Sequence, residues 1–153
     1  MSVENKIKKL ADSYGSYIAI PWRPDAAPLQ RVIFCVYSEH DELRLRARLG
    51  EFEIATKNAG HNWMQFDLTD TFADWLSNQR YSDKYFRQPG LLTTLLPKYL
   101  EYLVQKFNDF LTEQGADGNT VVSLIGAGSL FGLLKVKEVV ERFAPLVSGR
   151  LLV

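Results

Sequence analysis

Apolar residues recur at two spacings along the chain, and these spacings predict which segments form helices and which form strands. Five segments carry apolar side chains three or four positions apart, as amphipathic helices do: residues 3–14, 41–59, 72–76, 91–111 and 133–143. Four segments are apolar runs or alternate apolar with polar residues, as strands do: residues 31–37, 61–68, 120–125 and 148–153. We therefore predict an α/β fold with three layers, in which helices cover both faces of a mostly parallel sheet.

The strand patterns also predict positions within the sheet. Residues 32–36 and 120–125 are apolar on both faces, so both strands should be central. Apolar and polar residues alternate over residues 61–68, which indicates a strand that is half exposed or near an edge of the sheet. The last strand stops at Val153, so we expect it to be cut short and to leave an unpaired edge, through which two copies could form a homodimer.

The chain has the length of one domain. Its 153 residues are 46% hydrophobic and 12% aromatic, which is ample for a packed core. We predict a single domain over residues 1–153. Within it, residues 1–30 form an N-terminal helix and a proline-rich arm, and residues 77–90 form a surface insert of polar and aromatic side chains.

The arm and the insert carry the candidate partner-binding residues. Three prolines exclude a helix from the arm, and Trp22 there has two open interpretations: it pins the arm to the protein's own core, or it anchors another protein. Exposed aromatic side chains accompanied by arginine are typical of the centres of protein interfaces. The candidates are Tyr17, Trp22, Arg23, Tyr81, Tyr85 and Phe86.

Charge and cysteine content narrow the possible partners and location. Eighteen basic and eighteen acidic side chains give a formal net charge of zero, so neither nucleic acid nor a membrane is an expected partner. The single Cys35 lies in an apolar run, as a buried thiol in a reducing compartment would. No stretch resembles a membrane span or a secretory leader, so we expect a cytoplasmic protein.

A glycine turn follows the strand at 120–125 and leads into the last predicted helix. Gly126, Gly128 and Ser129 could hold a phosphate there, because glycines admit close backbone approach and a helix N-terminus offers free N–H groups. Together with Gly132, these glycines form the pattern Gly-x-Gly-x-x-x-Gly, which matches neither the dinucleotide-binding fingerprint nor the P-loop motif. The fold is thus Rossmann-like or P-loop-like in a degenerate form. The alternative to a phosphate-binding turn is a tight connection between strand and helix that binds no ligand.

Acidic residues gather at the predicted carboxyl ends of two other strands. They are Glu39, Asp41, Asp67 and Asp70, with His40 among them, and together they could hold a divalent ion for phosphotransfer or hydrolysis. The alternative is that each acid caps a helix. Arg44, Arg46 and Arg48 on the following helix are typical of a solvated face. Neither a nucleophile signature nor a metal-ligand spacing is present, so we assign no catalytic residue, metal ligand or cofactor.

Seven motifs, taken in order, cover most of the chain. They are Ile20-Pro-Trp22, residues 30–37, residues 45–53, Gly60-His-Asn-Trp63, Phe72-Ala-Asp-Trp75, residues 119–132 and residues 148–153. In this order they resemble the BrxB family, a bacterial family of unknown-function domains assigned to the B component of BREX phage-exclusion systems.

The resemblance implies a small non-enzymatic adaptor in a multi-protein antiphage system. Its neighbours there would be a phosphatase-fold protein called PglZ, a DNA methyltransferase, a large ATPase and a Lon-like protease, and the PglZ-like component is the implied partner. The family pattern continues into a Phe-Phe-Pro-Gly strand end and an Asn-rich segment with Asp-Gly-Trp, whereas this chain stops at Val153. We therefore expect a truncated gene, a chain shortened by design or an incomplete sequence, and the resemblance assigns no catalytic residues.

Overall fold

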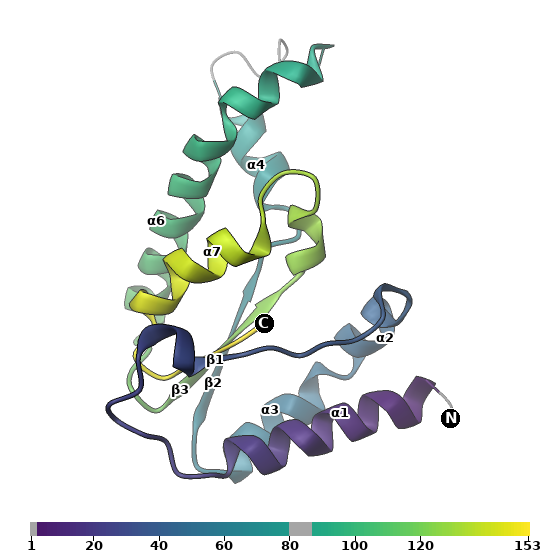
Figure 1. Cartoon of the computed structure of the whole chain (residues 1–153), viewed down its shortest axis with the longest axis vertical. Helices are drawn as coiled ribbons and strands as arrows, with labels where there is room; N and C mark the ends of the chain where they lie inside the picture. The colour runs from purple at the N-terminus through teal and green to yellow at the C-terminus, as the bar shows by residue number, and fades with distance from the viewer. Residues whose placement is uncertain (1–2, 80–86) are drawn as a thin grey trace.

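A four-stranded parallel sheet forms the middle layer of the computed structural model, which describes residues 3–79 and 87–153. The strands are β1 (Val32–Ile33), β2 (Asn62–Asp67), β3 (Thr120–Ile125) and β4 (Arg150–Leu152). Their order across the sheet is β1-β4-β3-β2. The α/β fold predicted from the sequence is confirmed (Figure 1).

Two of the predicted strand positions are confirmed. β3 is central and its β-branched residues Val121 and Val122 are fully buried, as the continuous apolar run predicts. β2 lies at one edge and pairs along its whole length with β3, from Asn62 opposite Thr120 to Asp67 opposite Ile125.

The predictions for the first and last strands are wrong. β1 is an edge strand of two residues, and Phe34 and Val36 beyond it are 60% and 82% exposed. β4 takes the central place instead, with β1 on one side and β3 on the other, and Cys35 N–H extends the pairing by donating to Val153 O at 2.8 Å. The last strand therefore has no unpaired edge, and a homodimer formed through a sheet edge would have to use β1 or β2.

Three helices cover one face of the sheet. They are α1 (Val3–Ile18), α2 (Glu42–Ala47) and α3 (Leu49–Asn58). α1 and α3 lie side by side (Figure 1), and buried residues of α1, α2, α3, β3 and β4 form one apolar cluster. The single helix predicted over 41–59 is in fact two, because the chain leaves helical geometry at Arg48 (φ −113°, ψ 15°).

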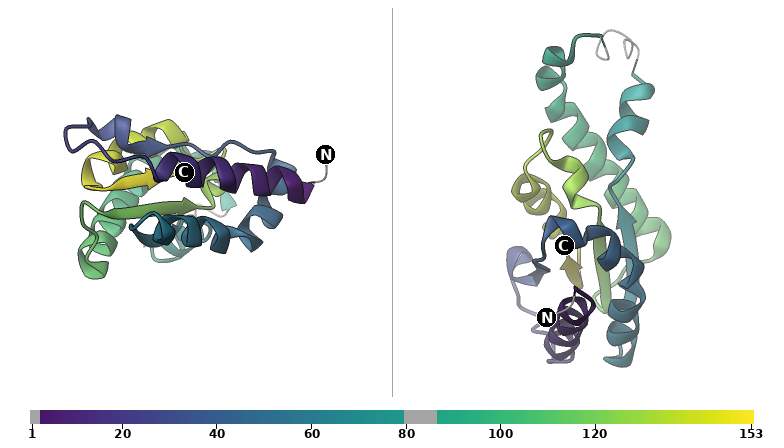
Figure 2. Two further views of the ribbon diagram at one scale, coloured as in Figure 1. Left: turned by 90° about the horizontal axis from the view of Figure 1, so that it is seen from below. Right: turned by 90° about the vertical axis from the view of Figure 1, so that its right-hand side faces the viewer.

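The other face is covered by α4 (Thr71–Ser77), α6 (Leu96–Gln114) and α7 (Val136–Phe143). Phe107 of α6 and Phe143 of α7 are fully buried and stack with ring centroids 4.1 Å apart, over Phe66 of β2. α4 and α6 also run together away from the sheet, which gives the molecule its long axis (Figures 1 and 2). Helices therefore lie on both faces, as predicted.

The ends of α6 follow ordinary helix chemistry. Pro97 stands in its first turn, where its missing N–H costs no hydrogen bond, and Gly115 ends it in the left-handed conformation (φ 70°). Between α4 and α6, a 3-10 turn spans Pro89–Thr94. The insert residues Tyr81, Tyr85 and Phe86 lie outside the described residues. Among the described helices, none combines the length and the apolar character needed to cross a membrane.

The glycine turn does not open directly into a helix, contrary to the prediction. Gly126 adopts the left-handed conformation (φ 76°) and begins a 3-10 turn over Ala127–Leu130. A second positive φ at Gly132 (80°) then redirects the chain, and α7 begins only at Val136.

Candidate functional site

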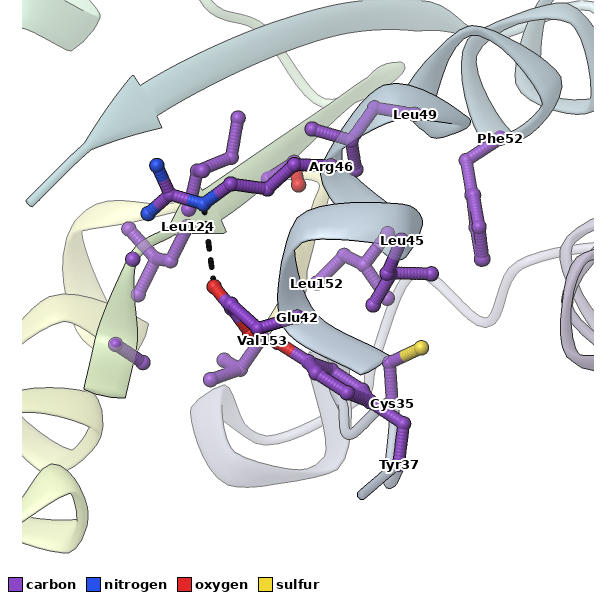
Figure 3. A pocket seen from close by; sticks show the side chains of 14 residues that line it. Cys35, Tyr37, Glu42, Leu45, Arg46, Leu49, Phe52, Leu124, Leu152 and Val153 are labelled. Atoms are coloured by element: carbon purple, nitrogen blue, oxygen red, sulfur yellow. Dashed lines mark hydrogen bonds and ion pairs between the residues drawn. The ribbon is translucent and has the colours of Figure 1, made fainter. Parts of the chain in front are cut away.

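The carboxyl ends of the four strands meet at one edge of the sheet, which is where ligands usually bind in parallel α/β folds. Figure 3 shows the side chains around the pocket at this edge, between α2 and the ends of β3 and β4. The pocket holds about 50 Å³, which is room for one or two water molecules.

Arg46 of α2 occupies the centre of this edge. Its Nε donates to Glu42 Oε1 at 3.2 Å, and its Nη2 donates to Thr69 Oγ1 at 2.6 Å and lies 4.0 Å from Asp67 Oδ1. Thr69 in turn donates to Asp67 Oδ1 from both its backbone N–H (2.9 Å) and its hydroxyl (2.5 Å). Tyr37 donates its phenol proton to Glu42 Oε2. The carboxylates here are therefore already neutralised and hydrogen-bonded by the protein itself.

The pKa values of two groups reflect this arrangement. Partial burial alone would raise the pKa of Asp67, but the two hydrogen bonds from Thr69 and the charge of Arg46 together lower it. Burial, helped by the hydrogen bond and negative charge of Glu42, raises the pKa of Tyr37 well above its usual range. Asp67 therefore stays an anion and Tyr37 a neutral phenol at neutral pH.

The glycine turn is closed by the same side chains. A Cβ at Gly126 would collide with Thr69 Oγ1 and Arg46 Nη2, so the space that a phosphate would need there is filled. The Ser129 hydroxyl donates to Gly126 O at 2.7 Å and lies 3.2 Å from Leu68 O. Gly128 is exposed and a Cβ there would meet no atom within 4 Å. The structure thus brings Gly126 and Ser129 into internal contacts, and the α-helix that follows the turn, α7, begins only at Val136.

The acidic residues do not come together as a metal site. Glu39 and Asp70 are exposed, and Asp67 is held by Thr69 and Arg46. Ser38 rather than Asp41 supplies a capping bond, accepting the His40 backbone N–H at 3.4 Å. Within residues 3–79 and 87–153, no three His, Cys, Asp or Glu side chains are grouped so that they could hold a metal ion.

Cys35 also lines the carboxyl-edge pocket. Burial raises the pKa of its thiol to about 11, so the sulfur is protonated at neutral pH and is a poor nucleophile. Cys35 has intermediate exposure, so it is less buried than the sequence predicts, although its thiol is not activated.

A larger pocket lies at the opposite edge of the sheet, where the strands begin. We call it the arm pocket; it holds about 240 Å³ and is lined by Tyr17, Ile20, Pro21, Trp22, Arg23, Ala26, Gln30 and Arg150. Three of the sequence-predicted partner-binding residues, Tyr17, Trp22 and Arg23, are thus brought together.

Trp22 is held between two other side chains. One face of its indole stacks on the imidazole of His61, and the Arg150 guanidinium carbon lies 4.7 Å from the Trp22 ring centroid. His61 is fixed by Asn119, whose Oδ1 lies 2.5 Å from His61 Nδ1. Trp22 therefore pins the arm to its own protein, which is the first of the two interpretations of this residue.

Tyr17 and Arg23 remain accessible on either side of Trp22. The Tyr17 side chain is 52% exposed. Arg23 is paired with Asp25 on the same arm, with its Nε and Nη2 each 3.3 Å from a carboxylate oxygen of Asp25. Both residues of this ion pair are largely exposed, so the ion pair is weak and easily broken.

A second hollow adjoins the arm pocket. It lies between α1 and β1, holds about 360 Å³ and is lined mostly by apolar side chains, among them Leu10, Phe34 and Tyr17. Tyr17 lines both hollows, so they form one continuous surface over the arm, α1 and the free edge of β1.

Sequence reasoning missed three members of this surface. Ile20 on the arm was not named as a candidate, and Phe34 lies in a segment predicted as a central strand, yet each is 60% exposed. Arg150 was overlooked within the strand prediction for 148–153, although a charged residue beside Leu151 and Leu152 in a buried strand was a signal that could have been noticed.

Searches with the sequence against protein-family models and curated proteins, and with the structure against solved structures, return no match.

Proposed function

We propose that this protein is a non-enzymatic adaptor that binds another protein through the surface formed by the arm, α1 and β1. The observation that carries the proposal is the concentration of exposed apolar side chains there. Of the nine large hydrophobic residues exposed in the described part of the chain, three line the two hollows of this surface: Tyr17, Ile20 and Phe34. A cluster of this kind on one face is typical of a protein interface, whereas single exposed apolar residues are not.

The resemblance to the BrxB family suggests the partner. We propose that the adaptor belongs to a BREX-type antiphage system and that its partner is the PglZ-like phosphatase-fold component. The free edge of β1 adds to the surface because unpaired backbone groups of an edge strand can accept a strand or loop of another chain.

Size exclusion with light scattering tests the proposal. The chain is run alone and mixed with a full-length PglZ-like protein of a BREX system, and a complex of fixed ratio is expected. Separate peaks from two folded proteins would contradict the partner assignment.

A matched pair of variants tests the surface. Ile20 on the arm and Ile54 on α3 are both 60% exposed, so replacing either with Asp should leave the fold intact. Ile20→Asp should weaken the complex about tenfold or more, because a charge would be buried at the interface, and Ile54→Asp should not. Equal affinities for the two variants would show that the partner binds elsewhere.

A further inference from the structure

The floor of the arm pocket carries a buried positive charge without a counter-ion. Arg150 is only 8% exposed, and in the described part of the chain no carboxylate forms an ion pair with it. One of its amino groups, Nη1, donates to Gly149 O at 3.0 Å. The ionisable groups that act on it are the Tyr17 phenol and a second cation, Arg31. Buried arginines are normally paired, so this one is unusual.

Arg31 adds a second positive charge beside Arg150. Val32 of β1 lies opposite Leu151 of β4, and Arg31 and Arg150 each stand one residue before that pair. Like charges side by side on neighbouring strands are destabilising. The Arg31 Nε is itself buried and has no hydrogen-bond partner. A bound anion would offset both the repulsion and the cost of burying these groups.

The shape of the pocket limits what the anion can be. The Arg150 guanidinium lies over the Trp22 ring, with its carbon 4.7 Å from the ring centroid, and its N–H groups other than the one bonded to Gly149 O can donate to an anion. The walls are largely aromatic and aliphatic: Tyr17, Ile20, Pro21, Trp22 and Ala26. The other cation in the lining, Arg23, is largely exposed and weakly paired with Asp25, so Arg150 is the buried cation of this pocket. One planar guanidinium between apolar walls matches a planar monoanion better than a phosphate dianion.

We propose that the arm pocket binds a carboxylate, presented by an acidic side chain of a protein segment that docks on the arm. The carboxylate accepts hydrogen bonds from the Arg150 guanidinium and from the Tyr17 hydroxyl, and the apolar walls receive the methylene groups of the side chain. The identity of the segment rests on the proposed function, since it would belong to the adaptor's partner, whereas the carboxylate site itself does not.

Titration followed by ¹H–¹⁵N NMR on the full chain tests the site. The first probe is N-acetyl-glutamate amide, and the matched neutral probe is N-acetyl-glutamine amide. The glutamate probe should give saturable shifts of the Arg150 Nε–H and Trp22 indole N–H signals, with a dissociation constant in the millimolar range, and the glutamine probe should not. Equal shifts with both probes, no saturable shift with either, or tighter binding of inorganic phosphate would overturn the proposal.

Two variants link the binding to the named groups. Arg150→Lys keeps the charge but loses the planar fork, so the glutamate probe should bind about tenfold more weakly. Arg142→Lys is the matched control, because Arg142 lies on α7 and pairs with Glu101 on the other face of the sheet. If Arg150→Lys disturbs the fold, Tyr17→Phe removes one hydroxyl from a half-exposed side chain and should still weaken the probe severalfold. Unchanged affinity in Tyr17→Phe and in a folded Arg150→Lys would contradict the proposal.

A third measurement separates this inference from the proposed function. A short peptide with one glutamate between alanines should bind more tightly than acetate, because the walls contact more than the carboxylate. Equal affinity would mean that the pocket takes free carboxylates rather than a protein segment. If the PglZ-like protein co-elutes but Arg150→Lys and Tyr17→Phe leave that complex unchanged, the carboxylate inference fails as a description of partner binding and the adaptor function stands.

Discussion

The indole ring of Trp22 stacks on the imidazole ring of His61, with 3.7 Å between the ring centroids and 8° between their planes. His61 directly precedes β2, and Arg150 on the far side of Trp22 begins β4. A single side chain of an otherwise irregular arm thus joins the beginnings of two strands. The arm is held in a fixed place, and the residues around Trp22, rather than Trp22 alone, are what a partner can reach.

Trp22→Ala should therefore lower the stability of the protein itself. The half-buried indole contributes apolar burial, the stack on His61 and the contact with Arg150, and we expect the free energy of unfolding to fall by about 2 kcal/mol. Urea denaturation measures this loss, and limited proteolysis should show earlier cleavage within residues 19–27. Trp22→Phe, which keeps an aromatic ring, should lose less. Unchanged stability and unchanged cleavage in Trp22→Ala would mean that the stack does not hold the arm.

The two glycines of the turn after β3 should respond differently to substitution. Gly126→Ala places a methyl group against Thr69 and Arg46 at a φ of 76°, and we expect a loss of about 2–3 kcal/mol in the free energy of unfolding. Gly128→Ala, which meets open space, should stay within about 0.5 kcal/mol of the parent. Chemical denaturation of the two variants gives the comparison. An unchanged free energy of unfolding in Gly126→Ala would show that the side chains of Arg46 and Thr69 do not fill the turn in solution.

Gly149 is required for the pairing of β3 with β4. A Cβ at this position would overlap the backbone of Thr120, which cannot move away without breaking the register that sets Val121 opposite Arg150. Gly149→Ala should cost about 3 kcal/mol or prevent folding. Gly118→Ala, where the added methyl meets no atom within 4 Å, is the nearby control. Equal thermal denaturation midpoints for the two variants would contradict the close approach.

Local patterns were sufficient to predict much of the fold. The apolar spacing of Tyr99, Leu103 and Phe107 marks the buried face of α6, and all three are fully buried. The β-branched run at Val121 and Val122 likewise predicts a central strand. In these segments the same residues that set the local conformation also make the core contacts, so the sequence and the structure agree.

Other features depend on segments far apart in the chain and could not be predicted. Residues 32–36 are as apolar as a central strand. However, β4, which is the last strand in the sequence, lies between β1 and β3, so β1 is at the edge of the sheet. Arg46 has the spacing of a solvated side chain, yet it reaches Thr69 and Asp67 after β2 and closes the glycine turn. The arm pocket requires α1, the arm and β4 together, and no local pattern joins Tyr17 to Arg150.

The buried phenol of Tyr14 should make stability fall at high pH. Tyr14 is 6% exposed, and burial raises its pKa from 10.0 to about 12, although a hydrogen bond with Thr56 partly opposes the shift. A raised pKa in the folded state means that the contribution is fully present below pH 10 and is lost as the pH rises toward 12. The loss for this group should reach about 3 kcal/mol.

Tyr14→Phe isolates that contribution. At pH 7 the variant should lose only about 1 kcal/mol, since Thr56 keeps its hydrogen bond to Phe52 O. Between pH 10 and 12 the free energy of unfolding of the parent should then approach that of the variant and fall below it, because the variant has no phenol to ionise. Cys35 and Tyr37, whose pKa values burial also raises, are common to both proteins, so the difference between the two curves reports Tyr14 alone. Urea denaturation across this pH range measures both curves, and parallel curves would show that Tyr14 is not buried as a neutral phenol.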